Sequence, residues 1–446
     1  MAGGTWTAQN KVRPGIYINF KSSGSPAVTQ GVRGTVAIAK ALSWGPVGRV
    51  SSIDAGADTT PYVGYPITAQ ESMFLREMLK GTNVTSGPTK VLLYRLPTEG
   101  AAPATAVIGD VTATALYPGV RGNGIAVTIA AGVDEPDSFI VSTLVDGEQV
   151  DSQQVQTAEE LKTNGWVSFS GTGALTATAG VPLTGGADGT AQPAAYASAL
   201  EALEPHSFDI LAYDGTDSTI RQAMIAFVKR LAEQEGKYSQ LVTSGAQGAD
   251  SRFVINANSG VVLEDGTELP PNEVVWWLAG AQAGAQYYQS LTYAAYPGAA
   301  DVAVRQTNGQ IEAGIKAGNI VLTEEFGQVR VETDVNTLTT YTQDIGEVFH
   351  KNTTMRVCSA LANDLYREFS LNFLGKVKNN EEGRGLFKSV ILDYLLTMYN
   401  KGALRTRPTG GDVTVEQGDS ADSIVITIAI QIGDAVEKVY LTITVS

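Results

Sequence analysis

The sequence predicts a multidomain protein of the α/β and α+β classes. We expect an α/β core domain with an inserted small β-sandwich or barrel domain, followed by a C-terminal α+β domain with strand-exchanging N- and C-terminal arms. Two observations support this. The 446 residues exceed what one hydrophobic core organises, so roughly two to four domains are expected. The spacing of apolar residues also changes along the chain, from mixed helices and strands to short strands only, and then to long helices.

The first predicted element is an N-terminal arm, residues 1–21. Ile16, Ile18 and Phe20 alternate with Tyr17 and Asn19, which is the period of a β-strand. A polar linker at residues 21–26 follows. A strand that such a linker separates from the body is predicted to act as an arm.

The α/β core domain is predicted over residues 22–97 and 187–345. Apolar runs typical of buried strands occur at residues 34–39, 91–95, 208–213, 240–244 and 253–256. Helical spacing alternates with them at residues 71–79, 194–203, 219–233 and 273–289. The last of these helices is rich in Ala and Gly, and its small side chains would allow close packing.

Residues 98–186 are predicted to form the inserted β domain. Ala, Thr, Gly and Val dominate this stretch, and helical periodicity disappears. Short strands, at residues 126–129 and 139–145 for example, lie between turns. This pattern favours a small sandwich or barrel.

Residues 346–446 are predicted to form the C-terminal α+β domain. Amphipathic helices are expected at residues 349–374 and 385–400, followed by strands at 424–432 and 439–445. The second strand belongs to a C-terminal arm, residues 436–446, in which alternate positions are apolar: Val439, Leu441, Ile443 and Val445.

A strand so near the end of the chain has two interpretations. It can complete its own sheet, or it can be lent to a neighbouring molecule as an added strand. The matching segment at the N-terminus favours exchange. Head-to-tail exchange gives a heterologous contact, which grows into a helical polymer instead of closing into a dimer.

Composition and charge exclude several classes of protein. The chain carries 46 acidic and 31 basic residues and no Lys/Arg-dense segment, which argues against direct nucleic-acid binding. The single cysteine, Cys358, excludes an internal disulfide and lies among apolar helical positions. No secretory leader and no membrane-spanning apolar run are present, so we expect a protein made in the cytoplasm without membrane contact.

The sequence offers no constellation for catalysis. Its two histidines, His206 and His350, lack a second histidine at metal-ligand spacing, and we expect both to be structural. Asp209, Asp214 and Asp217 cluster around a predicted strand end, where a cation could bind, although loop carboxylates are common. The Gly-rich stretches at 119–124 and 185–189 lack phosphate-binding spacing. We therefore predict no catalytic, cofactor-binding or metal site.

A charged segment joins the two C-terminal helices. Residues 375–385, GKVKNNEEGRG, mix both signs of charge. Such a segment is ordinarily a solvated loop. The alternative is a docking surface that holds a partner through weak, releasable ion pairs.

A series of short motifs resembles those of contractile tail sheath proteins from myophages and phage-tail-like particles, most of all the type in phages and prophages of Gram-positive bacteria. The motifs follow the family's order: RPGIYIN at 13–19, WGP at 44–46, YPGVRGN at 117–123, LTGGADG at 183–189, FDIL at 208–211, GVVLEDGT at 260–267, AGAQAG at 279–284, GNIVL at 318–322, DVNT at 334–337 and FLGKV at 373–377.

The resemblance implies a structural subunit, not an enzyme, that needs no cofactor. Such subunits polymerise as stacked rings around a tail tube, with the C-terminal domain innermost and the inserted domain facing outward, and contract to drive the tube through the target envelope. The implied partners are other copies of the chain, the tube protein, and baseplate and tail terminator proteins. The implied location is the virion tail, assembled in the bacterial cytoplasm.

The resemblance also implies roles for particular residues. Terminal arms of the family enter neighbouring C-terminal sheets, which here implicates Ile16, Ile18, Phe20, Val439, Leu441, Ile443 and Val445. A helix or loop of the family's C-terminal domain touches the tube, and the candidates here are Lys376, Lys378, Glu381, Glu382, Arg384 and Lys388. Two alternatives stay open: a hydrolase with a carbohydrate-binding insertion, in which His206 and Asp209 would act, and another baseplate or tail structural protein.

Overall fold

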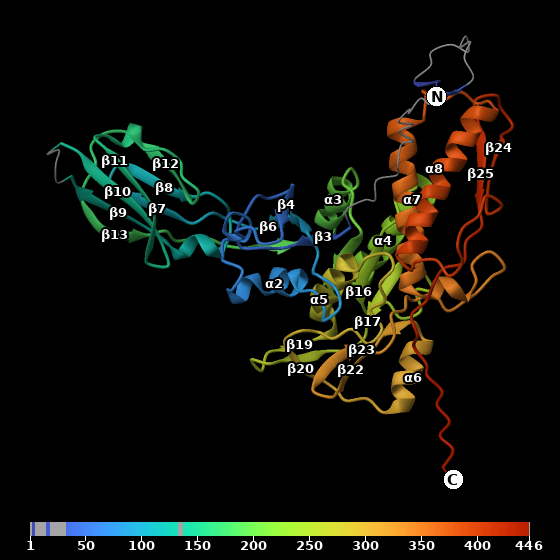
Figure 1. Ribbon diagram of the computed structural model, residues 1–446. Helices are drawn as coiled ribbons and strands as arrows, with labels where there is room; N and C mark the ends of the chain where they lie inside the picture. Colours follow the sequence, from blue (N-terminus) through green and yellow to red (C-terminus); the bar gives the residue numbers. More distant parts are fainter. Residues whose placement is uncertain (1, 5–14, 18–32, 133–136, 446) are drawn as a thin grey trace. The chain divides into compact units, whose positions relative to one another are not determined.

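The computed structural model describes residues 2–4, 15–17, 33–132 and 137–445, which form two compact units (Figure 1). The larger unit contains residues 31–363 and 434–446. The smaller unit contains residues 364–433 together with the first thirty positions. Helix α7 (Asn352–Asn372) contributes to both. No helix in the described parts of the chain is long and apolar enough to cross a membrane.

A seven-stranded sheet organises the larger unit. Neighbouring strands are parallel except for the antiparallel edge pair of β4 and β5. The strand order is β21 (Asn319–Ile320), β17 (Val254–Ala257), β16 (Gln240–Ser244), β15 (Ile210–Tyr213), β3 (Thr35–Lys40), β5 (Lys90–Arg95) and β4 (Val50–Asp54). The five strands predicted for the core are therefore confirmed.

Helices cover both faces of this sheet because its central strands are apolar on both sides. Val36 and Ile38 of β3 share one core with α2 (Met73–Leu79) and α5 (Pro271–Gly284). Ala37 points to the opposite face, where it joins the core formed by α3 (Pro193–Leu203) and α4 (Ser218–Glu235). The alternation of side chains along each strand thus builds an α/β domain of three layers.

Small residues let α5 approach the backbone beside it. A Cβ atom on Gly280 would lie 1.8 Å from the carbonyl oxygen of Met78, and one on Gly284 would lie 2.1 Å from that of Ser86. The close packing expected of this helix is confirmed. The helix ends earlier than predicted, at Gly284, because the backbone becomes extended at Ala285.

The contact at Gly280 makes a stability prediction. We expect Gly280→Ala to lower the free energy of unfolding by about 1–3 kcal/mol, because the added methyl group has no space beside Met78. Gly309→Ala in α6 (Asn308–Lys316) is the matched control, since a Cβ atom there meets nothing within 4 Å. Urea denaturation measures both, and equal stabilities for the two variants would contradict the packing described.

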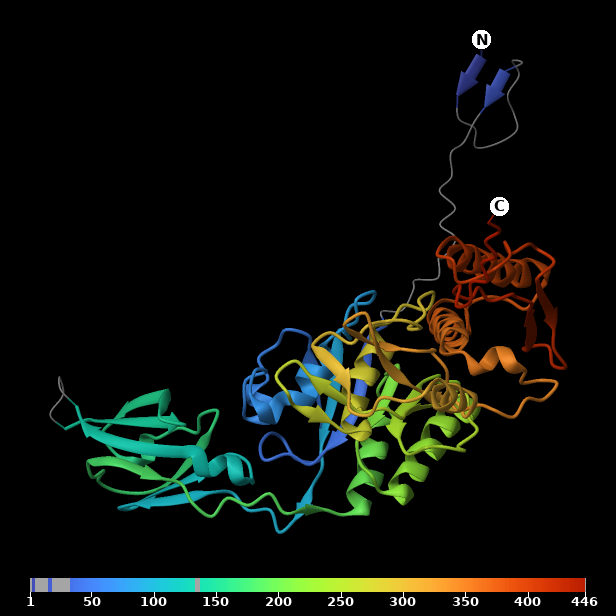
Figure 2. The same cartoon turned by 90° about the horizontal axis from the view of Figure 1, so that it is seen from below.

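The inserted domain is a sandwich of two antiparallel sheets and not a closed barrel (Figures 1 and 2). Alternate residues of its strands, including Ile125, Val127 and Ile129, are buried between the sheets. One sheet has the order β11 (Glu148–Val155), β10 (Phe139–Val145), β9 (Ile125–Ala131), β13 (Thr178–Pro182), and the other β12 (Val167–Gly171), β8 (Val111–Ala115), β7 (Thr105–Ile108).

Aromatic and arginine side chains join the sandwich to the core sheet. The ring of Trp44 lies 4.7 Å from that of Trp166 and 5.2 Å from that of Tyr117. The buried Arg95 of β5 donates hydrogen bonds of 2.6 Å to the carbonyl oxygens of Gly45 and Pro118. The WGP and YPGVRGN motifs, far apart in the sequence, therefore meet at this junction.

Shorter elements complete the larger unit. These are a two-stranded ladder of β6 and β14, a small sheet of β18, β19 and β20, a second small sheet of β22 and β23, and helix α6. Their bounds are α1 (Thr60–Val63), β6 (Thr98–Glu99), β14 (Thr190–Ala191), β18 (Val261–Leu263), β19 (Glu268–Leu269), β20 (Ala299–Val302), β22 (Leu322–Glu325) and β23 (Gln328–Val331), with single 3₁₀ turns at Gln70–Ser72, Val120–Gly124, Ala158–Glu160 and Glu347–His350.

The smaller unit packs a hairpin on two helices. The hairpin consists of β24 (Val413–Gln417) and β25 (Ile424–Ile428), and Ile424 and Ile426 pack against Phe387 of α8 (Glu381–Asn400). Helix α8 begins four residues earlier than predicted because the side chain of Asn380 caps it, accepting a 2.8 Å hydrogen bond from the Gly383 amide. The strand predicted over residues 424–432 ends at Ile428.

Candidate subunit and tube interfaces

The hairpin of the smaller unit has open edges. β24 and β25 pair only with each other among the described residues, from Val413 opposite Ile428 to Gln417 opposite Ile424. Beyond β25, residues 429–433 follow another segment, since the Arg405 amide donates to the Gln431 carbonyl oxygen at 2.8 Å. The isoleucines at 424, 426, 428, 430 and 432 are only half-buried. Among the described residues, neither outer edge of the hairpin is paired with another strand.

The C-terminal tail, residues 434–445, is extended and pairs with none of the strands that the structure describes (Figure 1). The prediction of a strand over 439–445 is wrong for the isolated chain, because a β-strand needs a neighbour to satisfy its backbone groups. Its alternate apolar side chains lie open to solvent: Val439 is 80% exposed, Leu441 78%, Ile443 74% and Val445 89%. The role of these four residues as arm contacts stays a prediction.

The N-terminal segment is described in part. Ile16 lies in β2 (Gly15–Tyr17), whose backbone pairs in parallel with β1 (Ala2–Gly4). Ile18 and Phe20 lie outside the described residues. The role of these three residues as arm contacts stays a prediction.

The candidate tube-facing residues gather at one end of α8. Lys376 and Lys378 lie in the preceding loop, Glu381, Glu382 and Arg384 in the first turns of the helix, and Lys388 one turn further. The lysines of the loop and both glutamates are exposed, whereas Arg384 and Lys388 are half-buried. Their contact with a tube stays a prediction.

A local hydrogen-bond network fixes this loop. Arg384 Nη1 donates to Asn379 Oδ1 at 2.9 Å, and Asn379 Nδ2 donates to the carbonyl oxygens of Ala421 and Ser423, each at 2.8 Å. Arg384 therefore positions the loop against the hairpin turn. The exposed charges of the loop are presented on a fixed backbone.

Exposed apolar side chains border this charged end, and sequence reasoning missed them. Tyr366, Leu371 and Leu374 are each more than 60% exposed although they are large and apolar. Tyr366 directly follows the buried Leu365, so it lies off the buried stripe of α7. That one-residue offset is the signal by which the sequence could have revealed it.

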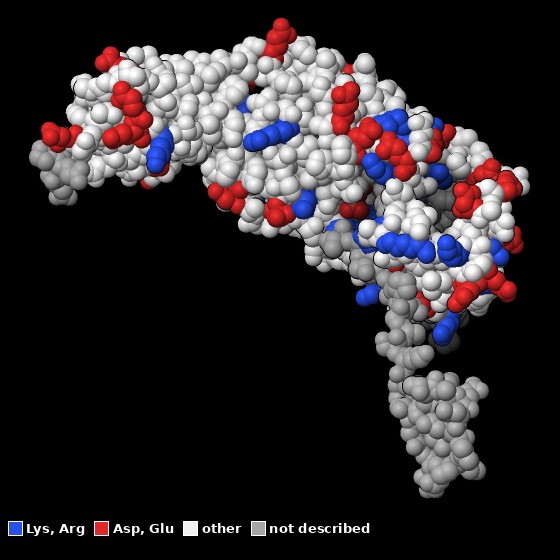
Figure 3. Space-filling view, turned by 90° about the horizontal axis from the view of Figure 1, so that it is seen from above, with Lys and Arg blue, Asp and Glu red and all other residues white. Residues whose placement is uncertain are grey.

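Charged side chains of both signs are interspersed on one face of the molecule (Figure 3). On the face shown in Figure 3, Lys and Arg side chains lie between Asp and Glu side chains. This agrees with the mixed signs of the α7–α8 loop. A partner of this face would meet alternating charges.

The acidic cluster of Asp209, Asp214 and Asp217 forms hydrogen bonds and an ion pair with the surrounding protein. The Asp209 carboxylate accepts hydrogen bonds from the Gly34 and Thr35 amides at 2.9 and 3.1 Å. Asp214 pairs with Lys40, and Asp217 caps α4 by accepting from two backbone amides. Within the described ranges, no group of three or more His, Cys, Asp or Glu side chains is arranged to hold a metal.

The histidines and the cysteine show no catalytic arrangement. His206 is exposed, whereas His350 is half-buried with Nδ1 2.6 Å from the Leu338 carbonyl oxygen, and burial lowers its pKa. Burial raises the pKa of the Cys358 thiol, which disfavours the reactive thiolate.

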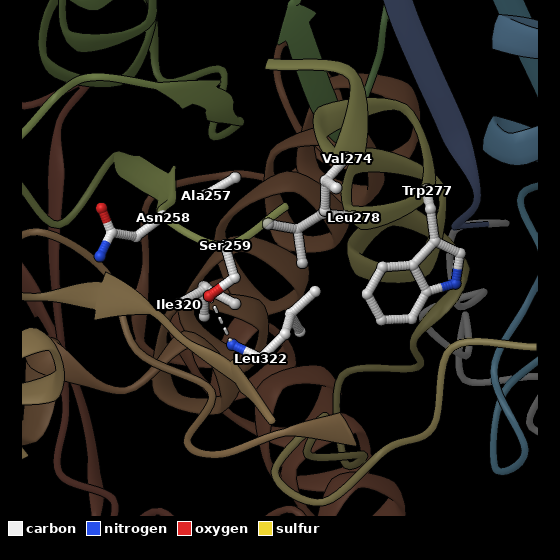
Figure 4. Close-up of a pocket in the computed structure, with 8 residues that line it drawn as sticks. All are labelled: Ala257, Asn258, Ser259, Val274, Trp277, Leu278, Ile320 and Leu322. Carbon is white, nitrogen blue, oxygen red and sulfur yellow. Dashed lines mark hydrogen bonds between the residues drawn. The ribbon is translucent and has the colours of Figure 1, made fainter. Parts of the chain in front are cut away.

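A small hollow beside the core sheet also lacks side chains that could act as a catalytic acid, base or thiol nucleophile (Figure 4). It lies beside the end of β17, and its lining has no acidic, basic or thiol side chain: Ala257, Asn258, Ser259, Val274, Trp277, Leu278, Ile320 and Leu322. Ser259 Oγ is occupied, since it accepts a 2.9 Å hydrogen bond from the Leu322 amide. The hollow is a packing feature of an apolar layer.

The domains described above match known protein families. Residues 33–96 match the tail sheath protein Gp18 domain III N-terminal region, and residues 98–188 the phage tail sheath protein beta-sandwich domain. Residues 189–337 match the phage tail sheath protein central domain, and residues 344–446 the phage tail sheath C-terminal domain. The chain belongs to the phage tail sheath protein family.

Individual relatives agree with this assignment. The sheath chain is 35% identical to phage-like element PBSX protein XkdK of Bacillus subtilis (strain 168), and the match covers 100% of both chains. The sheath tail protein of Desulfitobacterium hafniense is 41% identical with a TM-score of 0.86, covering 96% of this chain and 99% of that one. The sheath tail protein of Listeria innocua is 31% identical with a TM-score of 0.79, covering 93% and 95%.

A more distant likeness concerns the fold alone. The helical sheath of the anti-feeding prophage in its contracted state is 15% identical to the sheath chain, with a TM-score of 0.57 over 97% of this chain and 99% of that one. The fold class expected from the sequence is confirmed. The expected role as a tail sheath subunit is confirmed by the family matches.

Proposed function

We propose that the sheath chain polymerises helically around a tail tube and that neighbouring subunits are joined by exchanged terminal arms. The observation that carries this proposal is the exposed apolar tail, residues 434–445, in a chain whose C-terminal hairpin has two open edges. Donor and acceptor are thus both present and both unpaired among the described residues. Ile16, Ile18 and Phe20 would supply the second arm.

Backbone hydrogen bonds and apolar burial would both contribute to the energy of such an exchange. Each net backbone hydrogen bond stabilises by roughly 0.5–1.5 kcal/mol, so about four of them contribute ~2–6 kcal/mol per arm. Burial of the apolar face of Val439, Leu441, Ile443 and Val445 adds to this. Because the contact is heterologous, it extends into a helix.

Contraction, in this proposal, is a rigid-body rearrangement of subunits that stay tied by their arms. The extended sheath is a metastable packing, and the free energy stored on assembly drives the change, so neither a cofactor nor enzymatic activity is involved. The remaining partners are the tube, baseplate and tail terminator proteins, and the sheath assembles in the bacterial cytoplasm. The arm, core, inserted and C-terminal domain bounds given above belong to the same proposal.

Polymerisation of the purified chain tests this function. Concentrated protein is expected to form hollow helical tubes that are visible by negative-stain electron microscopy. A chain that stays monomeric at every concentration, or closes into dimers, would overturn the proposal.

The charged end of α8 supplies a prediction about the tube. We expect Lys376→Glu with Lys378→Glu to reduce co-sedimentation with preformed tubes several-fold, because both side chains are exposed and their contacts would be weak ion pairs. Self-assembly should persist. Lys229→Glu with Lys316→Glu, at two exposed lysines of α4 and α6, is the control for the same change of net charge. Equal losses for both variants would remove this loop from the tube surface.

A further inference from the structure

One side chain of the exposed C-terminal tail is bound to the folded core. The Glu437 side chain is only 17% exposed, whereas its neighbours Val436 and Val439 are 85% and 80% exposed. Its Oε2 atom forms an ion pair with Lys351, and its Oε1 atom accepts a 2.9 Å hydrogen bond from Thr292 Oγ1. Lys351 Nζ also lies 3.9 Å from Asp434 Oδ2. The root of the tail is therefore held while the rest of it is free.

The core builds the site that receives Glu437. Thr292 Oγ1, which donates to Glu437, itself accepts a 3.0 Å hydrogen bond from the Asp334 amide. Lys351 forms a β-bridge with Val335 and directly precedes α7. Both residues that hold Glu437 are thus fixed by the segment around Asp334.

Asp334 is a rigid support for this arrangement because it is buried and fully paired. Its Oδ2 atom lies 2.6 Å from Arg356 Nη2, and both side chains are 1% exposed. Gln282 and Asn352 donate to its Oδ1 atom at 2.8 and 2.9 Å. Thr292 and Lys351 therefore have little freedom to move.

We infer that Thr292 and Lys351 are positioning residues that fix the root of the C-terminal arm through Glu437. This rests on the proposed strand exchange. The donated strand then begins at Lys438 and, over residues 438–445, reaches at most about 26 Å at ~3.3 Å per residue. Released from Glu437, the free segment would begin at Asp434 and reach about 40 Å in more directions.

Holding the root lowers the entropy cost of donating the strand. An arm that is held at its root samples a smaller volume before it binds. It therefore loses fewer conformations when it pairs with a neighbouring sheet. Loss of the Glu437 contact therefore weakens assembly without removing any contact of the donated strand itself. The effect is specific to residues at the root.

Glu437→Gln and Lys351→Met test this inference in the full chain. Both variants are expected to raise the critical concentration for polymerisation about fivefold and to speed hydrogen exchange of the amides around residues 434–437 in the monomer. The charge swap Glu437→Lys with Lys351→Glu should recover most of the loss. Glu233→Gln, at an exposed position of α4, is the matched control and should behave as the unaltered chain.

The outcomes separate this inference from the proposed function. Truncation after Glu437 tests the arm itself. If truncation abolishes tubes but Glu437→Gln polymerises normally, the positioning role is overturned and the exchanged arm stands. If the truncated chain forms normal tubes, the exchange itself fails. If the charge swap restores no polymerisation, that result would also contradict the role given to the ion pair between Glu437 and Lys351.

Discussion

Truncation after Glu437 is expected to give a folded monomer that forms no tubes. The apolar side chains removed are 74–89% exposed, so their loss takes little buried area from the monomer and its thermal midpoint should not change. The polymer, in contrast, loses a donated strand from every subunit contact. Sedimentation velocity and negative-stain microscopy, together with a thermal melt, measure both parts of the prediction.

The alternation of side chains along residues 439–445 allows a more specific test of the donated strand, with a matched control. Leu441→Asp with Ile443→Asp charges the alternate apolar face, whereas Tyr440→Asp with Thr442→Asp places the same charges on the other face. The first variant should abolish tubes, and the second should retain them at raised concentration. Tubes from the first variant would contradict the register of exchange.

Asp334→Ala is expected to lower the free energy of unfolding by about 3–5 kcal/mol, because it leaves the buried Arg356 guanidinium without its counter-ion. The same change removes acceptors for Gln282 and Asn352. Urea denaturation of the monomer measures the loss. The exposed pair of Asp301 and Arg305 provides the control, since Asp301→Ala should cost less than about 1 kcal/mol. Equal effects at both sites would contradict the assigned burial.

The contribution of the Asp334–Arg356 pair to the stability of the fold depends on pH in a definite direction. Burial alone would raise the pKa of Asp334, but the charge of Arg356 and hydrogen bonds from Arg356, Gln282 and Asn352 lower it below the ordinary 3.8. A depressed carboxyl pKa stabilises the fold above the unfolded-state pKa. That contribution is therefore complete at neutral pH and is lost as the pH falls through the lowered value.

Local pattern was enough to predict most elements of the sheath chain. A continuous apolar run identified β3, which is buried on both faces, and period-two alternation identified the start of β25. The Ala and Gly content of residues 273–289 correctly predicted a closely packed helix, although it could not name Met78 as the neighbour of Gly280. The tail over residues 439–445 alternates like β25 but has no partner strand in the part of the chain that the structure describes, so pattern alone could not show whether it was paired.

Long-range polar contacts were beyond the reach of sequence reasoning. Asp334 and Arg356 are 22 positions apart, and Lys351 and Glu437 are 86 apart, with no spacing rule that joins either pair. The contact between the tilted rings of Trp44 and Trp166 could not be predicted for the same reason. Such contacts depend on how strands and helices pack, and packing is not encoded in any local period.

Disulfide cross-linking between tail and hairpin tests the exchange of strands most directly. In a Cys358→Ser background, one variant carries Thr442→Cys and another carries Thr414→Cys on β24 or Thr427→Cys on β25. A disulfide between the mixed variants can form only between molecules. We predict cross-linked dimers from the mixture and a ladder of multimers when one chain carries both cysteines. No cross-link in the mixture, with an internal disulfide in the doubly substituted chain, would show that the tail folds onto its own hairpin and would contradict the account.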